Sequence, residues 1–343
     1  MSAGYRPLDP AARWRIAVIG AGSWGTALAV HAARAGHEVR LWARRAELAE
    51  RLASSRENRD YLPDCALPEG LLVTADGGEA MEGAGLVLSV VPSRHLRAVW
   101  ERLGPSLPVG AHLVSATKGL EQDSGLRMSE VLAEYAEGRQ ASVAALSGPS
   151  FAAELVQGHP TAVTLGCTDS DAAEAVQHCL SEGPLRVYRN PDIIGVELGG
   201  ALKNVIAIAT GIADGLGFGT NTRAALITRG LGELARLAAA RGAMPRTLTG
   251  LAGLGDLVLT CTGPLSRNRH VGVQLGRGRR IDEIVAEMHM VAEGVETAAA
   301  AYHLSRKSGV QMPITEQVFA ILGGGKQPRE AIEDLMAREL VQE

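Results

Sequence analysis

The chain has 343 residues, enough for about two domains at the usual ~150 residues per domain. Its hydrophobic content of 46% and charged content of 21% are ordinary for a globular protein with a sizeable core. The net charge of −4 lacks the basic balance of a nucleic-acid-binding protein, and four scattered cysteines without C-x-x-C pairing indicate neither a disulfide framework nor a zinc site.

The first segment, residues 1–14, is polar, contains Pro7 and Pro10, and is predicted to be a disordered lead-in. A first domain is expected over residues 15–190 and a second over residues 191–343, because the sequence pattern changes after Pro191.

The most informative segment begins at Ile16. Residues 16–19 form a short apolar run typical of a buried parallel strand. Gly20, Gly22 and Gly25 follow at G-x-G-x-x-G spacing, and residues 26–33 favour a helix. This order predicts a dinucleotide-binding turn whose helix N-terminus faces the phosphates.

The end of the next predicted strand, residues 38–42, bears on the choice of cofactor. Many NAD sites carry an acidic residue there, but this chain has Arg44 and Arg45. A guanidinium there pairs with a 2′-phosphate, so NADP is favoured over NAD. The alternative is that both arginines are merely solvated and that Glu47 takes the acidic role.

Short apolar runs then alternate with helical stretches up to about residue 190. This alternation predicts βαβ units, and hence an α/β fold with an N-terminal doubly wound, Rossmann-type parallel sheet. The predicted strands cover residues 16–19, 39–42, 86–91, 112–115, 144–146, 161–165 and 185–188.

After Pro191 the pattern is helical to the end of the chain, which predicts an all-α C-terminal domain. Its first helix, residues 193–213, is rich in glycine and alanine and contains Lys203. Burying a lysine there is costly without a function, and Lys118 as a neighbouring cation would lower its pKa toward the range of acid/base catalysis. The alternative is an ordinary surface lysine.

Two further clusters lie in this domain. Asp256 is surrounded by glycines in an apolar stretch, and Ser266, Arg267 and Asn268 precede a helical run. Serine, asparagine and arginine at a helix start are good anion ligands, although Ser266 also suits a simple N-cap. Together with Lys203, these clusters are suited to hydride transfer on a small phosphorylated alcohol.

In this order the motifs resemble the bacterial-type NAD(P)-dependent glycerol-3-phosphate dehydrogenases over residues 15–335. The segments that carry the resemblance are residues 20–29, 117–119, 147–151, 197–204, 221–230, 253–262, 266–269 and 312–314. Two features depart from the family pattern: residues 1–14 lie outside its core, and Ala292 stands where a bulkier aliphatic residue is common.

The resemblance implies a role for each matching residue. Lys203 would be the catalytic acid/base. The substrate would contact Lys118, Gly148, Ser150, Lys203, Asp256, Ser266, Arg267 and Asn268. The cofactor would contact Gly20, Gly22, Ser23, Trp24, Gly25, Arg44, Arg45, Lys118, Ala152, Arg267, Val291 and Glu293.

The activity implied is NAD(P)H-dependent, reversible reduction of dihydroxyacetone phosphate to sn-glycerol 3-phosphate, which supplies the backbone of phospholipids. No metal, nucleic-acid partner or membrane segment is expected, the predicted location is the cytoplasm, and a homodimer is expected from the family alone. The alternatives are another phospho-alcohol or hydroxyacid dehydrogenase, or a non-catalytic NADP sensor.

Overall fold

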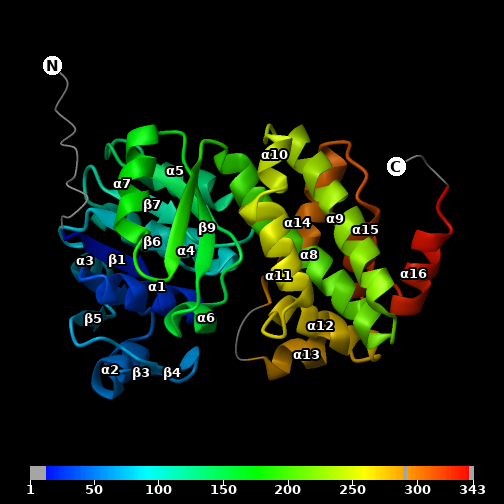
Figure 1. Cartoon of the computed structure of the whole chain (residues 1–343), viewed down its shortest axis with the longest axis horizontal. Coiled ribbons are helices and arrows are strands. Elements are labelled where there is room, and N and C mark those ends of the chain that lie inside the picture. Colours follow the sequence, from blue (N-terminus) through cyan, green and yellow to red (C-terminus); the bar gives the residue numbers. More distant parts are fainter. Residues whose placement is uncertain (1–12, 289–291, 340–343) are drawn as a thin grey trace. The chain divides into compact units, whose positions relative to one another are not determined.

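The computed structural model describes residues 13–288 and 292–339, which form two compact units (Figure 1). The sheet unit contains the described residues up to Val91, His95–Thr117 and Met128–Ile193. The helical unit contains Pro92–Arg94, Lys118–Arg127 and the residues from Ile194 onward. This division differs from a single boundary after residue 190, because two short segments from the first part of the sequence fold with the helical unit.

The main sheet has eight strands in the order β10-β9-β8-β7-β6-β1-β2-β5. The chain first moves outward from β1 to β2 and β5, then returns to β6 on the other side of β1. In doubly wound sheets, ligands bind at the carboxyl ends of the strands where the order reverses, here β1 and β6. The strands are β1 Arg15–Ile19, β2 Glu38–Trp42, β5 Leu71–Thr74, β6 Leu86–Ser89, β7 His112–Ser115, β8 Ser142–Ser147, β9 Thr161–Gly166 and β10 Leu185–Asn190.

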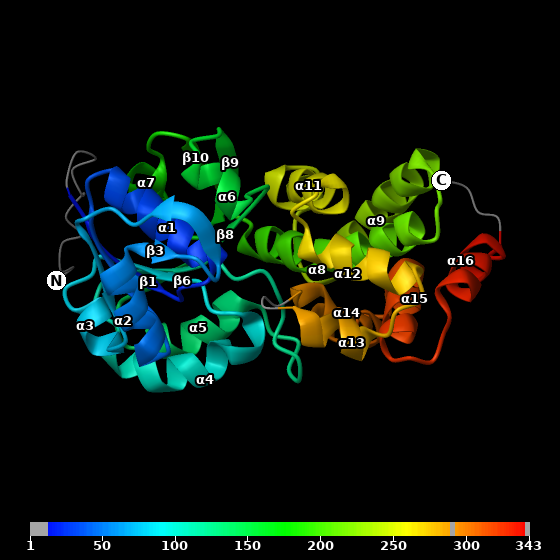
Figure 2. The same ribbon diagram turned by 90° about the horizontal axis from the view of Figure 1, so that it is seen from below.

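Helices cover both faces of this sheet, with α1 and α7 on one face and α4 and α5 on the other (Figure 2). Buried aliphatic side chains fill the layers between helices and sheet. The helices are α1 Ser23–Arg34, α2 Ala46–Ser55, α3 Gly77–Met81, α4 Ser93–Leu103, the 3₁₀ turn η1 Gly104–Ser106, α5 Met128–Ala136, α6 Ala152–Val156 and α7 Ser170–Leu180.

Two strands differ in direction from the fully parallel sheet that the sequence predicts: β9 runs antiparallel to β8, and β10 runs parallel to β9. The other neighbouring pairs in this sheet are parallel. The connection from β8 to β9 contains only α6, five residues long. Such a helix rises about 7.5 Å, too little to carry the chain back along a strand of about 20 Å.

Three short strands were not predicted. β5 is an edge strand of four residues with Leu72 exposed, and it carries little periodic pattern. β3, Glu57–Asn58, and β4, Leu62–Ala66, pair with each other in a separate antiparallel hairpin. Strands this short are stabilised by their tertiary neighbours rather than by their own sequence.

The predicted lead-in ends too late. Residues 1–12 lie outside the described residues, but Trp14 is buried in the core of the sheet unit. Its ring lies 5.7 Å from the ring of His112, and its carbonyl accepts a hydrogen bond from the Glu38 backbone. A large apolar side chain at the edge of a polar segment thus belongs to the fold.

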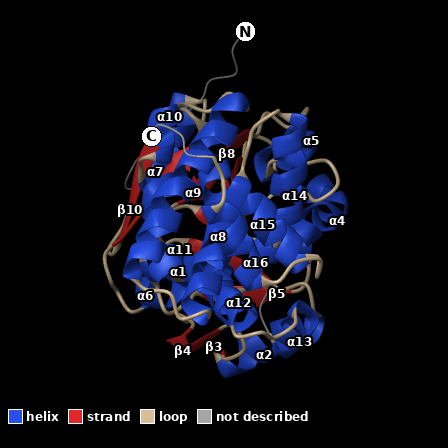
Figure 3. Ribbon diagram, turned by 90° about the vertical axis from the view of Figure 1, so that its right-hand side faces the viewer, coloured by secondary structure: helices blue, strands red, loops and turns tan. Residues whose placement is uncertain are grey.

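The described part of the helical unit is built from helices without strands (Figure 3). Its elements are α8 Ile193–Gly215, α9 Thr220–Ala240, α10 Pro245–Leu248, the π-helical turn η2 Leu251–Gly255, α11 Asp256–Thr262, α12 Arg267–Gly276, α13 Ile281–Glu287, α14 Glu293–Lys307, α15 Pro313–Leu322 and α16 Pro328–Met336.

Helix α8 is the centre of this unit. Its small residues let neighbouring backbones approach, since a Cβ on Gly211 would lie 2.2 Å from the Arg269 carbonyl oxygen of α12. By length and composition alone, α8 is apolar enough to cross a membrane. However, 83% of its apolar window is buried in the protein, as in the core helix of a globular domain.

Candidate active site

The turn from β1 to α1 has the geometry of a phosphate-binding loop. Gly20 has φ +124°, and a Cβ there would lie 2.6 Å from the Val90 carbonyl oxygen. A Cβ on Gly25 would lie 1.9 Å from the carbonyl oxygen of Gly20. Gly22 differs, because no described atom lies within 4 Å of where its Cβ would be. Two glycines therefore permit the tight turn, and the third leaves open space.

This turn fits the diphosphate of a dinucleotide. Gly22 is the N-cap of α1 and no side chain caps the helix, so its first N–H groups are available to an anion. The indole Nε1 of Trp24 is buried and has no hydrogen-bond partner among the described residues. Buried donors are normally paired, so a ligand acceptor beside Trp24 would complete this site.

The β3–β4 hairpin holds the turn in place. The Asn58 amide donates to the Ala21 carbonyl oxygen at 3.0 Å and to the Thr26 hydroxyl at 2.7 Å. The Ser23 hydroxyl donates to the Tyr61 carbonyl oxygen at 2.6 Å, so this side chain has a structural partner within the unit. Asn58 was not among the predicted site residues, because its sequence neighbourhood carries no recognisable motif of its own.

Arg44 and Arg45 follow β2, as the sequence indicates, and both are exposed. Arg45 is the N-cap of α2. Within the described ranges neither guanidinium forms an ion pair, whereas Arg51 of the same helix pairs with Asp60. Two unpaired guanidinium groups at this strand end are suited to a 2′-phosphate. Glu47 lies in the first turn of α2 and is also exposed.

The loop after β8 contains three further predicted residues. Gly148 has φ +145°, and a Cβ there would lie 2.9 Å from the Val163 Cα, so only glycine fits. The Ser150 hydroxyl donates to the Gly148 carbonyl oxygen at 2.9 Å. Ala152 is the first residue of α6 and packs against the core of the sheet unit.

The helical unit brings together the two predicted lysines and Asp256. Lys203 of α8 is buried, and its Nζ lies 2.5 Å from Asp256 Oδ1 and 2.7 Å from the Thr260 hydroxyl. The Nζ of Lys118 lies 2.7 Å from the other carboxylate oxygen, Oδ2. One buried carboxylate therefore holds two ammonium groups, which are separated by 85 residues in the sequence.

This arrangement tunes the acidity of Lys203. Burial lowers the pKa of Lys203 to about 8 because it removes water from the ammonium group. Asp256 acts in the opposite direction, and the positive charge of Lys118 lowers the pKa further. An ammonium group with this pKa gives up a proton readily near neutral pH.

Thr260 is a member of this cluster that the sequence analysis missed. Its hydroxyl accepts from Lys203 and donates to the Asp256 carbonyl oxygen at 2.6 Å. The only available signal was its spacing, because residues four apart on a helix lie on the same face. Lys203 has three ammonium protons, so these bonds leave one for a substrate oxygen.

Two of the predicted anion ligands at the start of α12 have structural partners. Ser266 is the N-cap and accepts from the Arg269 backbone at 3.2 Å, which agrees with the alternative reading of this residue. Asn268 donates to Asn204 Oδ1 at 2.9 Å and accepts from the Gly294 backbone at 2.9 Å. Its amide has one further N–H that these bonds do not use.

Arg267 and Glu293 lie in the same electrostatic environment. Desolvation lowers the pKa of Arg267, whereas the negative charge of Glu293 acts to raise it. Burial raises the pKa of Glu293 to about 7, while Arg267, Lys118 and Lys203 act to lower it. The pKa of each of these two side chains therefore depends on the charge of the other. Val291 lies outside the described residues.

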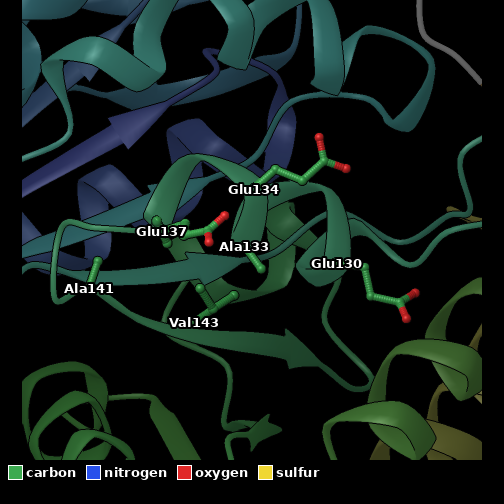
Figure 4. Close-up of a pocket in the computed structure, with 7 residues that line it drawn as sticks. Glu130, Ala133, Glu134, Glu137, Ala141 and Val143 are labelled. Carbon is green, nitrogen blue, oxygen red and sulfur yellow. The ribbon is translucent and has the colours of Figure 1, made fainter.

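A separate recess lies beside α5 in the sheet unit and is not suited to an anionic substrate. Figure 4 shows three carboxylate side chains around it, Glu130, Glu134 and Glu137. Glu134 also pairs with Arg97 at 2.6 Å. Two cations do converge at the lysine cluster, where Lys118 and Lys203 meet Asp256.

Comparisons with known proteins agree with this geometry. Residues 15–173 match the family model of the NAD-dependent glycerol-3-phosphate dehydrogenase N-terminus, and residues 192–333 match that of the C-terminus. A glycerol-3-phosphate dehydrogenase [NAD(P)+] of Geobacter sp. (strain M21) is 55% identical over 95% of this chain and 98% of its own length.

Two further proteins extend this similarity. An enzyme of the same name from Nitratidesulfovibrio vulgaris (strain Hildenborough) is 51% identical, over 96% of this chain and 100% of its own length. The crystal structure of glycerol-3-phosphate dehydrogenase from Coxiella burnetii superposes with a TM-score of 0.91 at 42% identity. That comparison covers 95% of this chain and 99% of the other.

Proposed function

Since this chain belongs to the NAD(P)-dependent glycerol-3-phosphate dehydrogenase family, we propose that it reduces dihydroxyacetone phosphate to sn-glycerol 3-phosphate. The observation that carries this proposal is the buried Lys203, held at 2.5 Å by Asp256 and tuned to a pKa of about 8. Reduction of a ketone needs a proton donor at the developing alkoxide, and this lysine has the required acidity.

Lys203 acts as the general acid in this proposal. Its ammonium donates two protons in hydrogen bonds to Asp256 and Thr260, which fixes the direction of the third. That proton goes to the C2 oxygen as the ketone becomes an alcohol. Asp256 keeps the lysine charged before the transfer, and Lys118 makes the ammonium more acidic. In the reverse direction, neutral Lys203 accepts the proton.

The phosphate of the substrate requires cations and N–H donors. Arg267 matches phosphate geometry, and the remaining N–H of Asn268 supplies a further donor. We assign Lys118, Asp256, Ser266, Gly148 and Ser150 as further substrate contacts. The Ser266 hydroxyl already accepts the hydrogen bond that caps α12. Its own proton is what it can still donate to the substrate.

The nicotinamide cofactor supplies the hydride. We assign its diphosphate to the turn of Gly20, Gly22 and Gly25, with Ser23 contributing through its backbone and Trp24 through Nε1. Arg44 and Arg45 favour NADPH over NADH. The family assigns further cofactor contacts to Lys118, Ala152, Arg267, Val291 and Glu293.

The product is the backbone of glycerophospholipids, so we place the enzyme in lipid biosynthesis in the cytoplasm, working as a homodimer. The test is oxidation of NADPH or NADH by the purified protein with dihydroxyacetone phosphate, followed by the loss of reduced-nicotinamide absorbance. Rapid oxidation is expected, faster with NADPH. If neither cofactor is oxidised although NADPH binds, another phosphorylated ketone or a sensor role replaces this proposal.

A further inference from the structure

The segment Lys118–Arg127 is a hairpin that folds with the helical unit although its sequence neighbours belong to the sheet unit. Leu120 and Arg127 form an antiparallel bridge. The Glu121 backbone donates to the Leu126 carbonyl oxygen at 2.9 Å, and Gly125 donates to that of Glu121 at 2.9 Å. Its internal bonds therefore give this short segment a defined shape.

Three contacts seat the hairpin on the helical unit. Leu120 is 4% exposed and belongs to the core of that unit. Gly119 packs so closely on Ser93 that a Cβ would lie 2.6 Å from the serine hydroxyl oxygen. At the far end, Arg127 Nη1 lies 2.7 Å from Glu197 Oε2. Lys118, which meets Asp256, is the first residue of the same hairpin.

The ion pair between Arg127 and Glu197 is buried, with side chains 15% and 5% exposed. Glu197 is on α8, six residues before Lys203, which is about 9 Å along the helix axis. The helix that carries the proposed acid therefore also fixes the end of the hairpin that carries Lys118. Removing one member of a buried ion pair is strongly destabilising, so loss of Arg127 should loosen the hold of α8 on the hairpin.

We propose that Arg127 and Glu197 are positioning residues for the reaction: their ion pair holds the 118–127 hairpin so that the ammonium of Lys118 stays on Asp256. This inference rests on the proposed function, since it assumes that Lys118 takes part in the reaction. Arg127 pairs with Glu197 at one end of the hairpin and Lys118 meets Asp256 at the other, so in this proposal both residues act through Lys118.

The inference has a specific electrostatic consequence. Lys118 lowers the pKa of Lys203, so a hairpin that releases Lys118 would let that pKa rise. The other groups that act on Lys203 are Asp256 and Cys261 of α11, and Glu293 of α14 is coupled to it. These three remain in place when Arg127 is changed. A shift in the pH dependence of kcat would therefore show that Lys118 has moved away from Lys203.

The experiment compares Arg127→Met with Lys118→Met in the full-length enzyme. For Arg127→Met we expect kcat for ketone reduction to fall by up to roughly 10²-fold, the scale of a catalytic group misplaced by about 1 Å. The alkaline fall of kcat should move to higher pH, as in Lys118→Met, and any change in the affinity for NADPH should match the change seen in Lys118→Met. In the double variant, Arg127→Met should add little to the loss already caused by Lys118→Met.

Matched variants separate positioning from stability. Arg94→Met removes the more exposed pair of Arg94 with Glu296 at 3.1 Å, which also joins a short segment to the helical unit, and should leave the pH profile unchanged. Arg127→Lys keeps the charge and should restore most of kcat. If Arg127→Met does not fold, Glu197→Gln, which removes the charge of the other partner, should show the same fall in kcat and the same shift of the pH profile.

Losses in kcat that simply multiply in the double variant, or an unshifted pH profile in Arg127→Met, would overturn the inference. If Lys118→Met itself keeps the wild-type kcat and pH profile, the proposed role of Lys118 fails instead. The two failures are therefore distinguishable.

Discussion

The chemistry of this protein depends on a few side chains whose charges are set by burial. Lys203 is nearly inaccessible to water, and Asp256 alone does not restore its usual basicity. A raised or lowered pKa at such a position is typical of catalytic groups. The two cations on Asp256 also explain why a fully buried carboxylate is tolerated here.

Lys203→Met removes the ammonium and keeps most of the apolar volume of the side chain. We expect kcat to fall by roughly 10² or more, the scale of a lost acid/base group, with NADPH affinity little changed. Steady-state kinetics and fluorescence titration of the cofactor measure the two effects. A variant with near wild-type turnover would show that another group donates the proton.

The same residue predicts how the wild-type rate depends on pH. Reduction requires the charged ammonium, whose pKa is about 8 in the folded protein. The kcat for reduction should therefore fall as pH rises through about 8, and the kcat for oxidation, which needs the neutral amine, should rise there. Parallel pH profiles in both directions test this, and a common optimum for the two would contradict it.

Arg44→Ala tests the basis of cofactor choice. The exposed guanidinium has no carboxylate partner among the described residues, so its loss should cost little stability. We expect roughly tenfold weaker binding of NADPH, because a charge-assisted contact to the 2′-phosphate is lost, and unchanged binding of NADH. Titration of both cofactors measures this. Equal losses for both would show that Arg44 does not read that phosphate.

At the scale of elements, one hairpin or helix often holds in place a functional residue that belongs to another element. The β3–β4 hairpin fixes the glycine turn through Asn58, and the 118–127 hairpin brings Lys118 to α11. Helix α12 begins with the Ser266 cap and is joined to α8 and α14 through Asn268. Short elements with weak sequence signals thus determine the geometry of the glycine turn in the sheet unit and of the lysine cluster in the helical unit.

Asn58→Ala should loosen the phosphate-binding turn. It leaves the Ala21 carbonyl oxygen and the Thr26 hydroxyl without this buried donor, a loss of about 1–3 kcal/mol in stability. We expect NADH and NADPH to bind several-fold more weakly and to equal extents, unlike in Arg44→Ala. Calorimetry with each cofactor provides the measurement, and unchanged affinities would restrict Asn58 to a folding role.

At the scale of the whole molecule, the chain does not divide at one point. The helical unit needs the Lys118–Arg127 segment from the first half of the sequence. Without it, Leu120 would be missing from the core and Glu197 would be a buried carboxylate without Arg127. The helical unit is therefore complete only when it includes this segment from the first half of the sequence.

This predicts that a fragment of residues 194–343 is much less stable than the same residues in the full chain. Loss of one partner of a buried ion pair costs about 3–5 kcal/mol, a large part of a domain's stability. Urea unfolding followed by circular dichroism measures the difference. A fragment that unfolds as cooperatively, and at the same urea concentration, as the helical unit of the full chain would contradict it.

The sequence by itself determined the local features. The glycine spacing after an apolar run predicted the β1–α1 turn, the alternation of strands and helices predicted the sheet, and the motif order indicated the family. The turn and the alternation of strands and helices follow from short-range sterics and hydrophobic periodicity, which depend on residues close together in the sequence. The sequence also predicted a role in the site for Lys203, Asp256 and Lys118, which the structure brings together in one cluster.

Only the tertiary structure decided how distant residues combine. Contacts between segments far apart in the sequence set the direction of β9 and β10, the burial of Trp14 and the joining of Lys118 to Lys203 through Asp256. The partners of Asn58, Thr260 and Arg127 depend likewise on distant segments or on one helix face. Such contacts are selected by packing and by the cost of leaving buried polar groups unpaired. Because that cost depends on which distant segments meet in the folded chain, it cannot be read from a local sequence pattern.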